Sequence, residues 1–125
     1  MTIYESGEDY LETIYLLTKR HSGVHAIEVA TELNFSKPSV TRALKILKTA
    51  GYITIDEDNH ILLTTSGLTR AKSIYERHTV ITRFLILCGV DETIASKDAC
   101  KIEHDLSVES FEAIKNIVGR GKIID

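Results

Sequence analysis

Residues 36–63, SKPSVTRALKILKTAGYITIDEDNHILL, decide the fold predicted for this chain of 125 residues. Ser36 is a favourable helix N-cap, and Pro38 is tolerated in the first turn because its missing N–H would have no partner there. Apolar residues then recur at helical spacing and give the helix an inner face of Val40, Leu44 and Leu47. The segment is therefore predicted to begin with a well-capped helix that runs to about residue 50.

A β-hairpin is predicted directly after this helix. Gly51 ends the helix, the next residues alternate like a strand to residue 56, and a second strand follows over residues 60–63. A shorter helix is predicted earlier, over residues 25–33. Its inner face is predicted to consist of Ile27, Ala30 and Leu33. Two short helices at a tight turn followed by a hairpin are typical of a winged helix-turn-helix.

The rest of the chain is predicted to be helical. Apolar stripes, caps and breaks predict helices over residues 8–20, 65–88, 92–106 and 107–118. The expected fold class is therefore mainly α. A winged helix-turn-helix domain with a short β-hairpin wing is expected over residues 1–64, and an all-helical domain over residues 65–125.

Composition indicates the expected compartment. No apolar run approaches the length that crosses a bilayer, and the first residues have neither a basic start nor an apolar core for export. Two cysteines make no disulfide framework, and a reducing compartment suits them as thiols. A cytoplasmic protein without a membrane partner is therefore expected.

Charge is distributed unevenly along the chain. The net charge is −3, yet residues 34–55 carry four basic residues and no acidic one. The outward face of the helix that follows Ser36 suits a DNA major groove, because Arg42 can pair with two acceptors on guanine and lysines can hold phosphates. The predicted DNA-binding residues are Ser36, Lys37, Pro38, Ser39, Thr41, Arg42, Lys45 and Lys48. The alternative is a solvated basic face on an ordinary helix. The acidic wing tip, residues 56–58, is expected to stay off the phosphate backbone or to contact it only through amides.

A second pattern indicates metal binding. On a helix, Cys100 would face the same way as Glu103 and His104, and a thiol, a carboxylate and an imidazole can all bind divalent transition metals. Further ligands are expected from elsewhere in the chain, and the candidates are Asp9, Glu12 and His78.

Each candidate also has an ordinary structural explanation. Cys100 would be a buried small hydrophobe, Asp9 and Glu12 would favour the helix dipole, and His78 would lie on a helix surface. A regulator that senses an organic ligand through the helical domain is a further alternative. An enzyme with Cys100 as its nucleophile is not expected, because the sequence offers no phosphate-binding loop and no candidate oxyanion hole.

Several motifs in order resemble the diphtheria-toxin-repressor family of metal-dependent transcription regulators, in particular its short manganese-transport-regulator-like branch. The motifs are EDYLETIY at residues 8–15, SKPSVT at 36–41, LTTSG at 63–67, RH at 77–78 and DACKIEH at 98–104. The resemblance implies a winged-helix domain that binds operator DNA and a helical domain that binds metal and forms a homodimer. It also implies a repressor of metal-uptake genes.

The resemblance also implies a ligand set. By position, Asp9, Glu12, His78, Cys100, Glu103 and His104 match the family's metal-site residues. Asp9 and Glu12 are manganese-branch choices, whereas the cysteine at position 100 is the iron-branch choice, so the site is a hybrid. Mn(II) and Fe(II) are the expected cellular metals, with Co(II) or Zn(II) possible in vitro. Thr82 and Ser96 stand where the iron branch has ligands of a second site.

Overall fold

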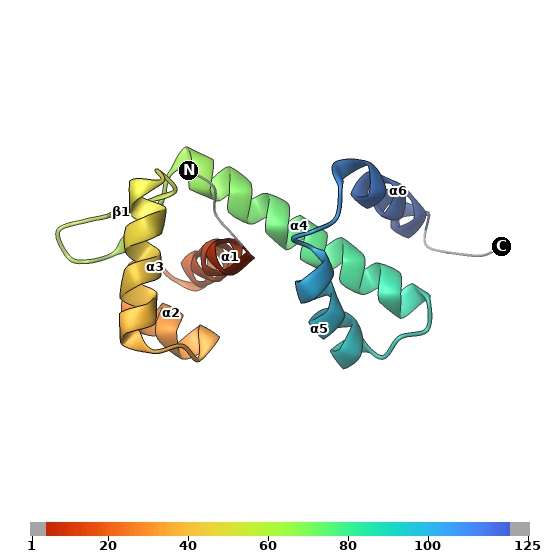
Figure 1. Ribbon diagram of the computed structural model, residues 1–125, viewed down its shortest axis with the longest axis horizontal. Coiled ribbons are helices and arrows are strands. Elements are labelled where there is room, and N and C mark those ends of the chain that lie inside the picture. The colour runs from red at the N-terminus through yellow and green to blue at the C-terminus, as the bar shows by residue number, and fades with distance from the viewer. Residues whose placement is uncertain (1–4, 121–125) are drawn as a thin grey trace. The chain divides into compact units, whose positions relative to one another are not determined.

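The computed structural model describes residues 5–120, and the chain forms two compact units, Met1–Lys72 and Ser73–Asp125. Figure 1 labels the helices of the two units and the first strand of the hairpin. In chain order they are α1 (Glu5–Arg20), α2 (Ala26–Leu33), α3 (Lys37–Thr49), β1 (Ile53–Ile55), β2 (Ile61–Leu63), α4 (Thr65–Leu87), α5 (Glu92–Ile102) and α6 (Val108–Gly119). The predicted fold class, mainly α with a short hairpin, is confirmed.

The first unit packs α1, α2, α3 and the hairpin around one apolar core. Its most buried side chains include Leu11 and Ile14 of α1, Val29 of α2 and Leu47 of α3. Asn34 takes the left-handed conformation, with φ of 57°, and turns the chain from α2 into α3. The hydroxyl of Ser36 accepts a hydrogen bond from Ser39 N at 3.3 Å and caps α3 as predicted.

The hairpin is shorter than its alternating pattern indicates. β1 and β2 pair antiparallel over three residues each, with Ile53 opposite Leu63 and Ile55 opposite Ile61. Ile61 N also donates to Val24 O at 2.8 Å, which joins the hairpin to the segment before α2. The wing is therefore held in place by this backbone bond and by Ile53 and Ile61, which are buried in the core of the first unit.

The second unit consists of the later part of α4 together with α5 and α6. Its buried cluster is formed by Ile81, Ala99 and Phe111, one from each helix. Asp91 caps α5 and Ser107 caps α6 through their side-chain oxygens. Within residues 5–120, no helix is both long enough and apolar enough to cross a membrane.

Two sequence-based predictions about these helices are wrong. Ile27, predicted to face inward, is 49% exposed, and Val29 takes the buried position instead. The helix predicted to run to residue 106 ends at Ile102, and Glu103 is its C-cap. The physical reason is a side chain from α4, Arg77, that binds the carbonyl groups at this helix end.

Candidate metal centre and DNA interface

Three of the predicted metal ligands converge in the second unit. His78 lies on α4, Cys100 lies on the last turn of α5, and Glu103 caps that helix. One ligand atom from each of them lies within 4.8 Å of the other two. A nitrogen, a thiol and a carboxylate at this separation form a donor set that fits a divalent transition metal.

Glu103 is the unusual member of this cluster. Its side chain is 0% exposed, and neither carboxylate oxygen has a hydrogen-bond partner within the described residues. Oε1 lies 3.3 Å from His78 Nδ1. A buried carboxylate is costly unless it is paired or coordinates a metal, so these residues fit a bound cation.

His78 is oriented with one nitrogen toward the cluster and the other away from it. Nδ1 lies 3.3 Å from Glu103 Oε1 and 3.7 Å from Cys100 Sγ, whereas Nε2 lies 3.4 Å from the hydroxyl of Ser96. A polar partner on the far nitrogen of a histidine orients the ring and selects its tautomer. Ser96 thus holds the imidazole in the orientation that directs Nδ1 at the other two donors.

Arg77 supports the loop that carries Glu103, a role that the sequence-based analysis missed. Its guanidinium donates to Glu103 O at 3.0 Å and to Leu106 O at 2.6 Å, and it lies 5.2 Å from the centroid of the Phe111 ring. These bonds satisfy the carbonyl group of the α5 C-cap and a carbonyl group just before α6, and so favour the end of α5 at this point. The neighbouring position of Arg77 and His78 in the sequence is the one signal that could have indicated this residue.

The other predicted ligands lie outside this group of three. His104 is half-buried in the turn after α5, and not on a helix as predicted. Asp9 and Glu12 are half-buried on α1, in the other unit. Cys100 is exposed, so its alternative explanation as a buried small hydrophobe is wrong.

The outward face of α3, here called the reading helix, carries the predicted DNA-binding residues. Val40, Leu44 and Leu47 are buried as predicted. Ser39 is half-buried. The other seven predicted residues are exposed: Ser36, Lys37, Pro38, Thr41, Arg42, Lys45 and Lys48. A groove of about 350 Å³ runs between this helix and the wing, lined by Thr41, Lys45, Lys48, Ile55 and Asn59 among others. The helix thus presents a continuous basic and hydroxyl-bearing surface.

The acidic wing tip is organised by its own backbone. Asp56 Oδ1 accepts hydrogen bonds from Asp58 N and His60 N, each at 2.9 Å, and Oδ2 lies 3.1 Å from His60 Nδ1. The backbone N–H of His60 is the main cause that holds the pKa of Asp56 below its ordinary value. Ligand atoms of Asp56, Asp58 and His60 also lie within 4.8 Å of one another. Because Asp56 already closes the turn, the tip carboxylate has a structural role.

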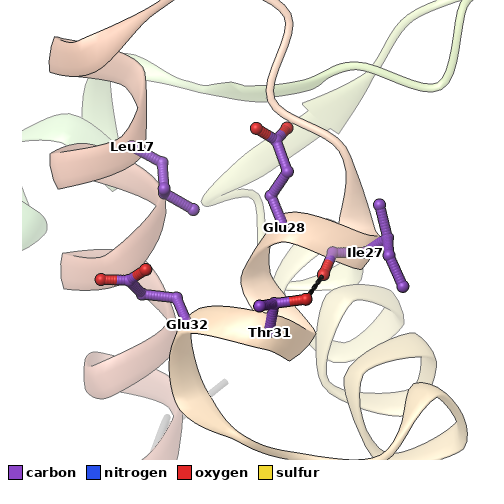
Figure 2. A pocket seen from close by; sticks show the side chains of 5 residues that line it. All are labelled: Leu17, Ile27, Glu28, Thr31 and Glu32. Atoms are coloured by element: carbon purple, nitrogen blue, oxygen red, sulfur yellow. Dashed lines mark hydrogen bonds between the residues drawn. The ribbon is translucent and has the colours of Figure 1, made fainter.

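A shallow pocket lies between α1 and α2 in the first unit. Figure 2 shows its lining, with Leu17 on α1 facing four residues of α2. The pocket measures about 280 Å³, and its carboxylates belong to Glu28 and Glu32. Both already have partners, since His21 Nε2 lies 2.6 Å from Glu28 and Arg20 lies 3.5 Å from Glu32. Both acidic side chains of this pocket therefore already take part in ion pairs.

Together, a winged-helix unit with a basic reading helix and a helical unit with converging thiol, carboxylate and imidazole groups define a metal-responsive DNA-binding transcription regulator. Residues 2–61 match the family model described as iron dependent repressor, N-terminal DNA binding domain. Residues 64–123 match the model described as iron dependent repressor, metal binding and dimerisation domain. The chain belongs to the iron-dependent repressor family, which confirms the resemblance to the diphtheria-toxin-repressor regulators.

Individual relatives agree with this assignment. An HTH-type transcriptional regulator of Methanocaldococcus jannaschii is 41% identical over 113 residues, which cover 89% of this chain and 90% of the relative. The transcriptional regulator MntR of Escherichia coli is 33% identical over 108 residues, covering 86% of this chain and 70% of MntR. The solved manganese regulator SloR is 28% identical with a TM-score of 0.82, and the match covers 95% of this chain and 55% of SloR. The chain thus spans about half the length of SloR.

These findings separate the alternatives. The chain is a DNA-binding regulator with a divalent metal cofactor and a dimerisation domain, and it is not an enzyme. The family senses metal, so the hypothesis of an organic effector is not supported.

Proposed function

We propose that this chain is a cytoplasmic repressor of metal-uptake genes that binds its operator as a homodimer when Mn(II) or Fe(II) is coordinated. The observation that carries the proposal is the buried Glu103 carboxylate, without a hydrogen bond in the described region, beside the imidazole of His78 and the thiol of Cys100. In a regulator of this family, we propose that this cluster is the site that senses the metal ion.

The proposed ligand set joins two parts of the chain. Its members are Asp9, Glu12, His78, Cys100, Glu103 and His104. Carboxylates favour Mn(II), while the thiolate favours softer ions such as Fe(II), Co(II) or Zn(II), so we expect the last two to bind in vitro as well. The functional domains that these ligands link are residues 1–64, which read DNA, and residues 65–125, which bind metal and dimerise.

The proposed mechanism rests on charge. A bound cation would neutralise the repulsion among the carboxylates of Asp9, Glu12 and Glu103. Without it, this repulsion would disfavour the arrangement in which α1 shares the site with the ligands of the helical domain. With it, these residues would hold α1 in place, and the reading helices of the dimer would be spaced for operator DNA. A coupling of about 1–3 kcal/mol is enough, since it changes affinity about 5–150-fold.

On the DNA, the residues of α3 have two proposed roles. Arg42, with the hydroxyls of Ser39 and Thr41 and the ring of Pro38, reads base edges in the major groove. Lys37, Lys45 and Lys48 hold phosphates, and Ser36 caps the helix that presents them. The acidic tip at residues 56–58 stays off the backbone.

The metal site is tested by Co(II) binding, because a thiolate ligand gives Co(II) an intense charge-transfer absorption. We expect this absorption in the wild type and in Cys88→Ser, and its loss in Cys100→Ser. The Cys88→Ser variant is a matched control, since Cys88 is also an exposed free thiol. An unchanged thiolate band in Cys100→Ser would remove Cys100 from the site and contradict the proposal.

A further inference from the structure

One ion pair in the first unit, between a buried glutamate and a partly exposed arginine, lies directly beside a proposed ligand. Glu8 is 8% exposed and belongs to the same turn of α1 as Asp9, one turn before Glu12. Its Oε2 accepts a hydrogen bond from Arg70 Nε of α4 at 3.0 Å. A charge-assisted hydrogen bond to a buried carboxylate is short and directional, so it helps to fix the position of the helix that carries the carboxylate.

Arg70 also reaches the start of the wing. Its terminal nitrogen donates to the hydroxyl of Tyr52 at 3.3 Å, and its guanidinium lies 5.8 Å from the centroid of that ring. One side chain of α4 therefore holds both the ligand-bearing turn of α1 and the residue that opens the hairpin.

Tyr52 is in turn fixed to the reading helix and to α4 by its backbone. Its N–H donates to Leu47 O of α3 at 3.0 Å, and its carbonyl accepts from Thr64 N at 3.0 Å. The carbonyl also packs against Gly67, where an added Cβ would lie 1.9 Å from the oxygen. The end of α3, the hairpin and the root of α4 thus form one closely packed corner, to which Arg70 attaches α1.

We infer that Arg70 is a positioning residue of the metal response: through Glu8 and Tyr52 it holds the Asp9–Glu12 turn of α1 in a fixed relation to the end of the reading helix. The inference rests on the proposed function. Arg70 itself binds neither metal nor DNA. Its role is to transmit the fixing of α1 by a metal ion to the end of α3.

The test compares DNA affinity at saturating Mn(II) with DNA affinity in chelator, for the wild type and for Arg70→Met. We expect the ratio of these affinities to fall about fivefold or more in Arg70→Met, within the usual range of coupling between sites. DNA affinity in chelator is expected to change less than about twofold, because no predicted DNA-binding residue is altered. Arg70→Lys, which keeps the charge and loses the forked donor geometry, is expected to restore part of the ratio.

Two further variants keep the test decisive. Glu8→Gln removes the charge of the same pair without changing its shape, so it should lower the ratio as well, and it replaces Arg70→Met if that variant does not fold. Glu76→Gln is the control, because Glu76 lies on α4, as Arg70 does. It breaks an exposed ion pair with Lys115 of α6 (3.1 Å) and should leave the ratio unchanged.

The outcomes separate the two proposals. If wild-type affinity does not respond to Mn(II) or Fe(II), the proposed function fails. If the wild type responds and both Arg70→Met and Glu8→Gln keep the full ratio, the inference about Arg70 fails alone. Equal loss of affinity with and without metal in both variants would make the pair merely structural and would also overturn the inference.

Discussion

Replacing Glu103 with glutamine should make the protein more stable than the wild type without metal and less stable than the wild type with metal. The carboxylate is fully buried and accepts no hydrogen bond in the described residues, with His78 Nδ1 3.3 Å away. A buried polar group without a partner costs about 1–3 kcal/mol, and more when it is charged. Glutamine keeps the shape and removes the charge, so the metal-free free energy of unfolding should rise by about 1 kcal/mol.

Metal should stabilise the wild type far more than it stabilises Glu103→Gln. At a free Mn(II) concentration of about one hundred times its Kd, the wild type gains about 2.7 kcal/mol. At about 4 °C per kcal/mol for a chain of this size, its Tm should rise by about 10 °C. Glu103→Gln, with a poorer ligand, should gain far less, and should therefore be the more stable protein in chelator and the less stable one in Mn(II).

Differential scanning calorimetry in chelator and in Mn(II) measures both effects. Glu112→Gln serves as control, because this glutamate is exposed on α6, and its replacement should stay within about 0.5 kcal/mol. A Glu103→Gln protein that loses stability in chelator, or that keeps the wild-type shift in Mn(II), would refute the reasoning.

Three further predictions concern Arg42, Gly67 and Asp56 of the first unit, with Gly119 of the second unit as a control. Arg42→Ala should cost about 1–3 kcal/mol of discrimination at one base pair, measured by affinity for a set of single-base operator variants; a uniform loss on all DNA would make Arg42 a phosphate contact. Gly67→Ala should lower the free energy of unfolding by about 1–3 kcal/mol, since its Cβ would meet Tyr52 O at 1.9 Å. Gly119→Ala, with open space around its Cβ, should be neutral or mildly stabilising in the same denaturation experiment. Asp56 has a folded-state pKa below its unfolded value, so its stabilisation of the wing is complete above the unfolded pKa and is lost as pH falls through the folded one. NMR titration of the carboxyl carbon should find that low pKa, and an ordinary value would argue against the hydrogen-bonded turn.

Local signals made the reading helix and its caps predictable. The Ser36 cap and the spacing of Val40, Leu44 and Leu47 depend only on neighbouring residues, and each was predicted from sequence. Hydrophobicity alone misplaced Ile27, because a short helix packed on two neighbours buries Val29 instead. Periodicity indicates a face but does not select which neighbours cover it.

Long-range contacts explain what sequence could not provide in the second unit. The end of α5 depends on Arg77, which bonds to Glu103 O across 26 positions. The isolation of the Glu103 carboxylate likewise depends on the packing of three helices. Sequence spacing and family resemblance selected the donors His78, Cys100 and Glu103, but only the fold brings their ligand atoms within 4.8 Å.

We propose that a metal ion held by this cluster controls DNA binding. An anaerobic titration of Mn(II) and of Fe(II) into the protein tests this control. Fluorescence anisotropy would follow its affinity for a duplex recovered from a randomised pool. The account predicts that affinity rises about 5–150-fold with metal and returns to its starting value in chelator. Affinity that is the same at saturating metal and in chelator would contradict it.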